Sequence, residues 1–420
     1  MSEQAAAAPA PSPNLYLRLV GLGVVIGIPA AFVAALFLAV VHDLEGWLWD
    51  GDATAWYLVI GLPAVGAAIV YLARRFLPGD GGNPPIEGIG GAPARVRDAP
   101  GIALAAIATL SFGAILGPEA PLIALGSIVG LTVTLFTKVG ERQKRVLGTA
   151  GSFSAISALF GGPVVAGTMM VEGGLEMGAR LLPVLLPGFV AAASGYLLFV
   201  GFGNWGGLHE QGLAVPNLPA YHGEHLRDLI VAVVVGILAA LTISGVRRLS
   251  AAVSGIGVGL AILLVAGGLT VGLLAQIADW LGASSQDVLF SGQAGVPALA
   301  TADSTKIVLI LFVAKALGYA VSLGCGFRGG PIFPAVFLGI ALATFAVVWF
   351  DVSPTLAVAV GAAAGMAAGT QLLITSTLFA SLLVGDAGPD AIPAAVFAAA
   401  AAWLTMRALA ARSNPVAPIT

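Results

Sequence analysis

The sequence predicts an all-α polytopic membrane protein, built as two helical halves with broken and re-entrant helices. Of its 420 residues, 58% are hydrophobic and only 9% are charged, whereas soluble domains carry about 25% charged residues. Apolar blocks long enough to cross a bilayer of about 30 Å recur along the chain, and many are interrupted by Gly or Pro. We find them near 15–41, 56–77, 102–137, 149–171, 182–202, 227–246, 251–281, 306–324, 332–350, 354–384 and 391–411.

A polar segment rich in Gly, Pro and His divides the chain into two apolar stretches of similar length. Each stretch contains Gly/Pro-rich interruptions at intramembrane depth, and paired broken helices are typical of inverted-repeat transporters. We therefore predict a disordered N-terminal tail at 1–13, a first membrane half at 14–202, a polar linker at 203–226, a second membrane half at 227–412 and a C-terminal tail at 413–420.

Glu119 is the most informative residue, because it is a lone acid inside a long apolar stretch. An acid at membrane depth costs about 2.5–3.5 kcal/mol on insertion scales, so it is usually functional or paired. Gly117 and Pro118 precede it and Pro121 follows it. This pattern predicts a helix that begins here, with its free N–H groups and positive dipole end directed at an anion.

Two other interruptions share this pattern. In the first, Gly81, Gly82 and Asn83 precede two prolines and could present backbone amides to an anion; an ordinary surface loop is the alternative. In the second, at 326–334, a helix starting at Pro331 would leave the N–H groups of Ile332 and Phe333 free. Irregular backbone at membrane depth must be buried in protein or line a watery cavity, so we expect the interruptions to share one cavity.

Three other charged residues have competing interpretations. Arg328 is either a surface charge, which we favour, or a charge that attracts anions to the mouth of a pore. Lys315 lies within an apolar run and is expected to pair with a buried acid rather than to reach the membrane surface. Glu172 ends an apolar run and is either a solvated helix-end acid or part of a proton relay.

The composition argues against several classes of site. The single Cys325 excludes an internal disulfide and a multi-cysteine metal site. All four histidines lie outside the apolar blocks, which argues against haem ligation within the membrane. We expect no metal, no cofactor and no nucleic-acid partner. Asp80 and Asp386 each follow a glycine and faintly suggest an aspartyl intramembrane protease, but both lie in polar turns.

Three motifs in order resemble the CLC family of chloride channels and proton/anion exchangers. LGPEAP at 116–121 resembles the family's GREGP signature, and GCGFRGGPIFPAVFLG at 324–339 resembles its GGxFxP segment. PVVAG at 163–167, followed by Glu172, resembles PLAGxLFxLE. The resemblance covers about residues 15–410 and is strongest to a divergent bacterial branch of ion-transport proteins.

The resemblance implies a homodimer in a bacterial plasma membrane, with an anion pathway in each subunit. Glu119 would be the external gating glutamate, which blocks the anion site when deprotonated and leaves it when protonated. Glu172 would belong to the proton route. The anion site would include Gly117, residues 81–83, Ile332 and Phe333.

The chain departs from the family pattern at several positions. Pro118 replaces the arginine of GREGP, and GGNPP replaces the serine-containing GSGIP. Gly173 stands where exchangers carry their internal proton glutamate. No tyrosine occurs in residues 393–420, where the family has one that coordinates the anion.

From these observations we expect a transporter of small inorganic anions, chloride first, gated by protonation of Glu119 and not an enzyme. Uncoupled conduction and proton/anion exchange both remain open. A fluoride exporter of the same fold is an alternative. The protease using Asp80 and Asp386, and a membrane scaffold in which Glu119 is merely paired, are the alternatives from other classes.

Overall fold

A computed structural model of the chain describes residues 13–50, 55–85, 94–175, 178, 181–208, 213–223 and 225–413. Every regular element in these ranges is a helix, which confirms the predicted all-α class. Eight of the described helices are long and apolar enough to cross a membrane, and three shorter apolar helices accompany them. The chain is therefore a multi-pass membrane protein, as predicted.

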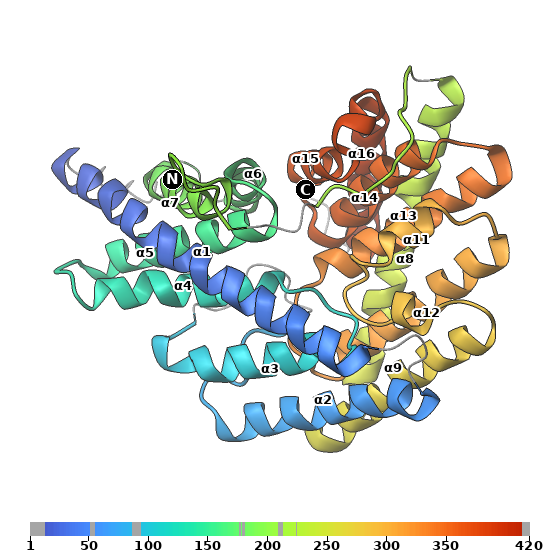
Figure 1. The fold of residues 1–420 in the computed structure, drawn as a ribbon, viewed down its shortest axis with the longest axis horizontal. Coiled ribbons are helices and arrows are strands. Elements are labelled where there is room, and N and C mark those ends of the chain that lie inside the picture. The colour runs from blue at the N-terminus through green and yellow to red at the C-terminus, as the bar shows by residue number, and fades with distance from the viewer. Residues whose placement is uncertain are drawn as a thin grey trace, which may run out of the picture. The chain divides into compact units, whose positions relative to one another are not determined.

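The helices are numbered in chain order, with short 3₁₀ segments between some of them (Figure 1). In the first part of the chain they are α1 (Pro13–Trp49), α2 (Trp56–Phe76), α3 (Ala99–Ser111), α4 (Glu119–Thr134), α5 (Glu141–Leu159), α6 (Pro163–Gly173) and α7 (Leu182–Val200). The rest are α8 (Leu226–Ser254), α9 (Leu260–Trp280), α10 (Ser285–Val288), α11 (Val296–Ala300), α12 (Thr305–Gly324), α13 (Ile332–Phe350), α14 (Pro354–Thr370), α15 (Ile374–Val384) and α16 (Ile392–Ser413).

The chain forms two compact units, and their boundaries interleave along the sequence. Unit 1 comprises Met1–Ala34 and Leu125–Glu210, and unit 2 comprises Ala35–Ala124 and Gln211–Thr420. The predicted division into two membrane halves, with a linker between them, stays a prediction. Its bounds are 14–202, 203–226 and 227–412. Most of the predicted tail at 1–13 and of the tail at 413–420 lies outside the described residues.

Unit 1 packs its helices through small residues. Gly126 of α4 lies against the backbone of Gly151 in α5, at a separation that leaves no room for a side chain. The hydroxyl of Ser154 donates a hydrogen bond to the carbonyl of Gly27, 2.6 Å away. Small residues and polar contacts of this kind hold helices together in lipid, where the hydrophobic effect between helices is absent.

Unit 2 holds all three interrupted segments that the sequence singles out, and its packing is also close. Helix α2 lies beside α3 and α9 (Figure 1), and Gly268 and Gly272 of α9 touch the α2 backbone. Helix α14 consists mostly of small, apolar residues on every side and is buried along almost its whole length. It packs against α8, α13 and α16, as expected for a helix with no polar face. Helix α13, whose first turn is buried, packs against α14 along this surface.

Candidate anion site at two helix starts

Glu119 begins α4, as the sequence predicts, and its side chain is fully buried. Its Oε1 accepts a hydrogen bond from the backbone N–H of Phe333, at 2.9 Å. Its Oε2 has no hydrogen-bond partner among the described residues. The carboxylate thus lies against the first turn of α13, where the free N–H groups and the helix dipole favour a negative charge.

The two interrupted segments that carry Glu119 and Phe333 are joined by their backbones. Gly117 donates its N–H to the carbonyl of Gly330 at 2.7 Å, and Gly330 donates back to Gly117 at 2.5 Å. A Cβ on either glycine would overlap the Glu119 carboxylate. Glycine is therefore needed at both positions so that the acid can lie directly on this pair.

Helix α12 holds both segments in place through two residues on one face. The Ser322 hydroxyl accepts the N–H of Ile115 at 3.0 Å, in the loop that leads to Glu119. The Tyr319 hydroxyl donates to the carbonyl of Pro331 at 2.9 Å, in the loop that leads to Phe333. Residues three apart share a helix face. Sequence reasoning missed both residues, although two polar side chains three apart in an apolar helix are a signal that could have indicated them.

The predicted anion-binding residues have different positions in the structure. Ile332 and Phe333 form the buried first turn of α13, with Pro331 at the N-cap, as predicted. The N–H of Gly117 is donated to the carbonyl of Gly330, so this amide is occupied, and the anion-binding role of Gly117 stays a prediction. The N–H of Gly82 is likewise donated to the carbonyl of Gly79, at 2.9 Å.

The 79–82 segment is a tight turn with an unusual backbone. Gly79, Asp80, Gly81 and Gly82 are four successive residues with positive φ, at +85°, +48°, +69° and +95°. Glycine adopts such angles without steric cost, and aspartate is among the few other residues that tolerate them. A short helix is expected from the sequence to start at Pro84 and Pro85, and the residues that follow, 86–93, lie outside the described residues. Asn83 lies at the edge of this turn and is partly buried.

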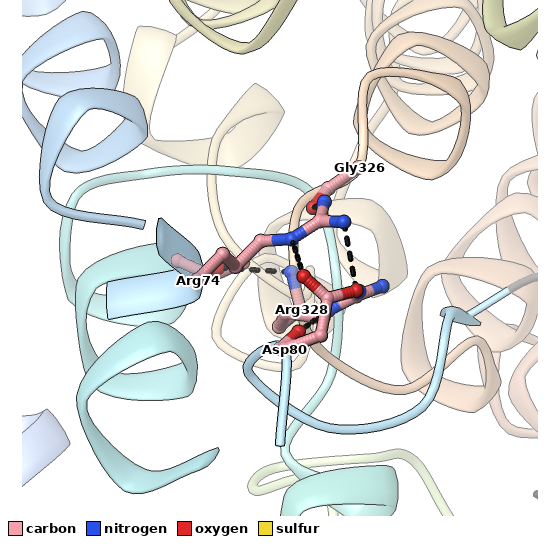
Figure 2. A network of polar contacts seen from close by, with 5 residues as sticks. Arg74, Asp80, Gly326 and Arg328 are labelled. Atoms are coloured by element: carbon pink, nitrogen blue, oxygen red, sulfur yellow. Dashed lines mark hydrogen bonds and ion pairs between the residues drawn. The ribbon is translucent and has the colours of Figure 1, made fainter. Parts of the chain in front are cut away.

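Arg328 is not the surface charge that we favoured. It is 3% exposed, and its Nη2 donates to Asp80 Oδ2 at 2.6 Å. Arg74 donates from Nε and Nη2 to the same carboxylate, both at 2.9 Å, and from Nη1 to the carbonyl of Gly326 at 2.7 Å. Figure 2 shows the two guanidinium groups converging on Asp80.

Lys315 makes no direct ion pair with an acid of the described residues, although Asp287 is the acid that attracts its charge. Lys315 is fully buried, and its Nζ donates to three backbone carbonyls. These belong to Asp287, Val288 and Leu289, at 3.1, 2.9 and 2.7 Å. The ammonium also lies 4.7 Å from the centre of the Phe337 ring. The lysine is a cap for the end of α10, where a positive charge is favoured by the helix dipole.

Glu172, Asp386 and Asp80 are the remaining predicted residues. Glu172 is half-buried near the end of α6, in unit 1. Asp386 is exposed in a short 3₁₀ segment, Gly385–Ala387. Asp80 has its carboxylate held by two arginines, so it is not poised as the acid–base partner of a second aspartate.

Comparison with known families gives a decisive match. The family model described as voltage gated chloride channel matches residues 65–407, which is most of the chain. The chain belongs to this family. Members of the family are transporters or channels, so the chain is not an enzyme and the protease alternative is wrong. The family's broad function, anion transport across a membrane, applies to the chain as well.

Relatives and solved structures agree with the family assignment. "Putative ion-transport protein YfeO" of Escherichia coli O1:K1 / APEC is 28% identical over 341 residues, covering 76% of each chain. The protein of the same name from Shigella boydii serotype 4 (strain Sb227) matches to the same extent.

A structure described as a slow cyanobacterial Cl⁻/H⁺ antiporter superposes with a TM-score of 0.75 at 17% identity, covering 96% of both chains. One described as a CLC-type fluoride/proton antiporter superposes with a TM-score of 0.74 at 18% identity, covering 95% of this chain and 98% of its own. At such identities the likeness shows the fold shared by family members.

Proposed function

We propose that the chain moves small inorganic anions, chloride first, across a bacterial plasma membrane and that protonation of Glu119 opens the route. The observation that carries the proposal is the hydrogen bond from the Phe333 amide to the Glu119 carboxylate. A group of donors that holds a carboxylate at a helix start also suits a free anion. The two compete for the same place.

Protonation decides this competition. A neutral carboxyl group loses its attraction to the helix dipole and to the backbone donors, so it can leave and an anion can take its place. Oε2, for which the described part of the chain offers no hydrogen-bond partner, can receive a proton without breaking the bond from Phe333 to Oε1. Anion flux is therefore expected to rise as the pH falls.

Purified protein in liposomes tests the proposal. Efflux of chloride, nitrate and fluoride is measured with proton movement between about pH 4 and pH 8, a range that begins near the ordinary pKa of a glutamate. Chloride flux that increases toward acid pH supports it. Liposomes that release none of the three anions at any pH would contradict it. Fluoride released far faster than chloride would favour the fluoride-exporter alternative, for which the fluoride/proton antiporter fold neighbour gives a reason.

We also propose that Glu172 takes part in proton transfer, and the same assay tests this part separately. Glu172→Gln is expected to keep anion flux and to reduce any accompanying proton movement. Equal proton movement in the variant and the wild type would remove Glu172 from the proton route. The proposed homodimer, taken from the family resemblance, is tested by the mass of the purified protein in detergent.

A further inference from the structure

The Asp80 cluster, defined as Arg74, Asp80 and Arg328, has a charge arrangement that the Glu119 site does not use. Two guanidinium groups converge on one carboxylate, at 2.9 Å and 2.6 Å. Asp98 lies beside this turn, but its carboxylate faces Arg97 at 3.8 Å and accepts the N–H of Arg95 at 3.0 Å.

Exposure within the cluster is uneven. The side chain of Asp80 is 59% exposed, whereas those of Arg74 and Arg328 are 12% and 3% exposed. The carboxylate therefore lies over two largely buried cations. A carboxylate that leaves such a position regains water at little cost, while the buried arginines would then need another anion.

The backbone of the turn that carries Asp80 is held, because the Asp80 carbonyl accepts a hydrogen bond from Arg328 Nε at 3.0 Å, so only the Asp80 side chain would need to turn away. Glycines flank Asp80 on both sides, and all four residues of the turn have positive φ. The arginines are anchored as well. Arg74 holds the carbonyl of Gly326, and the N–H of Arg328 is donated to the Thr109 hydroxyl at 3.1 Å.

One backbone segment links this cluster to the site at Glu119. Arg328 and Phe333 are five residues apart, and each holds the carboxylate of a different segment of the chain. Planar guanidinium groups bind oxyanions and halides through several N–H donors at once, so the cluster has the chemistry of an anion site whose ligand is an aspartate.

We propose that Arg74 and Arg328 form a second anion site, separate from Glu119, in which Asp80 is an internal ligand that a small inorganic anion displaces. Anion binding there does not depend on transport. Only an influence of the bound anion on anion flux would rest on the proposed function. Because a tethered carboxylate competes at a high effective concentration, the wild type should bind anions weakly at this site and a variant without the carboxylate should bind them about tenfold or more tightly.

Calorimetric titration of the detergent-solubilised protein with chloride, in a buffer of bulky organic anions, tests the proposal. Asp80→Asn should gain a binding event that the wild type shows only at far higher chloride, and Asp80→Asn/Arg328→Gln should lose it. Glu141→Gln is the matched control, since Glu141 is an exposed carboxylate paired with Lys144 at 2.6 Å elsewhere. It should bind as the wild type does. A folded Asp80→Asn protein with wild-type binding would overturn the proposal.

A second measurement needs no variant. Crystals of the wild-type protein soaked at molar bromide should show an anomalous peak between the Arg74 and Arg328 side chains, with Asp80 turned away. No peak there would overturn the proposal even if Asp80→Asn failed to fold. Liposomes without anion flux, together with the extra binding in Asp80→Asn, would reject the proposed transport and keep the second site. Intact anion flux without extra binding in Asp80→Asn would keep the proposed transport and reject the second site.

Discussion

The backbone N–H of Phe333 donates to Glu119 Oε1 across 2.9 Å and joins two residues that are 214 positions apart. This contact brings together an acid from one interrupted helix and the first turn of another. The acid and the donors come from different segments, and a buried carboxylate is stabilised by such backbone donors. The contact is therefore both a structural link and the place where a transported anion would compete.

Gly330→Ala should disturb the gate directly. A Cβ at this position would overlap Glu119 Oε2, so the carboxylate must move away from Phe333. We expect flux with a weakened pH dependence, together with a lower melting temperature. Gly245→Ala is the control, because a Cβ there meets nothing within 4 Å. It should keep the wild-type pH profile and gain up to about 1 kcal/mol, since alanine is favoured over glycine within a helix. A Gly330→Ala protein with wild-type pH dependence would show that the overlap is relieved elsewhere.

Tyr319→Phe should loosen the start of α13. The substitution removes the hydrogen bond to the buried Pro331 carbonyl and is expected to lower the free energy of unfolding by about 1–3 kcal/mol. Since this carbonyl precedes the donors that hold Glu119, the pH midpoint of anion flux should also shift. Tyr57→Phe, at a 59% exposed tyrosine, should change neither quantity. Thermal unfolding and the liposome assay measure them, and a loss of stability with an unmoved midpoint would reduce Tyr319 to a packing residue.

Lys315→Met should destabilise the protein strongly. It would leave three carbonyls of the α10 region without their donor, two of them buried and one part-buried, and each buried group costs about 1–3 kcal/mol. Lys306→Met provides the comparison on the same helix, because Lys306 is exposed. It should change the melting temperature little. Equal melting temperatures for the two variants would mean that water or a side-chain rearrangement replaces the Lys315 ammonium.

The sequence predicted the membrane class and the starts of both helices at the site. The length of the apolar blocks predicts the membrane class, and the pattern of glycine, proline and acid predicts the helix starts. Both are properties of single segments of the chain. Glu119 and Phe333 were both identified as site residues for this reason. The bond between them was implied only by the family resemblance.

The features that the sequence did not indicate have the opposite cause. Arg328 was read as a surface charge because its partner Asp80 is 248 positions away. Lys315 was expected to pair with an acid, and Asp287 does attract its charge, but a lysine can equally satisfy its three donors on backbone carbonyls at a helix end. The hydrogen bond from the Gly117 N–H to the Gly330 carbonyl likewise forms between segments that are far apart in the sequence. Periodicity and spacing describe single segments and do not indicate such long-range pairing.

The pH profile of Glu119→Gln tests the central claim most directly. Glutamine keeps the size of the side chain but carries no charge and no titrating group. Chloride efflux from liposomes should then be insensitive to pH and at least as fast as the acid-activated wild type, with Glu141→Gln retaining the wild-type profile. A Glu119→Gln protein that transports chloride with the unaltered wild-type pH dependence would contradict the account.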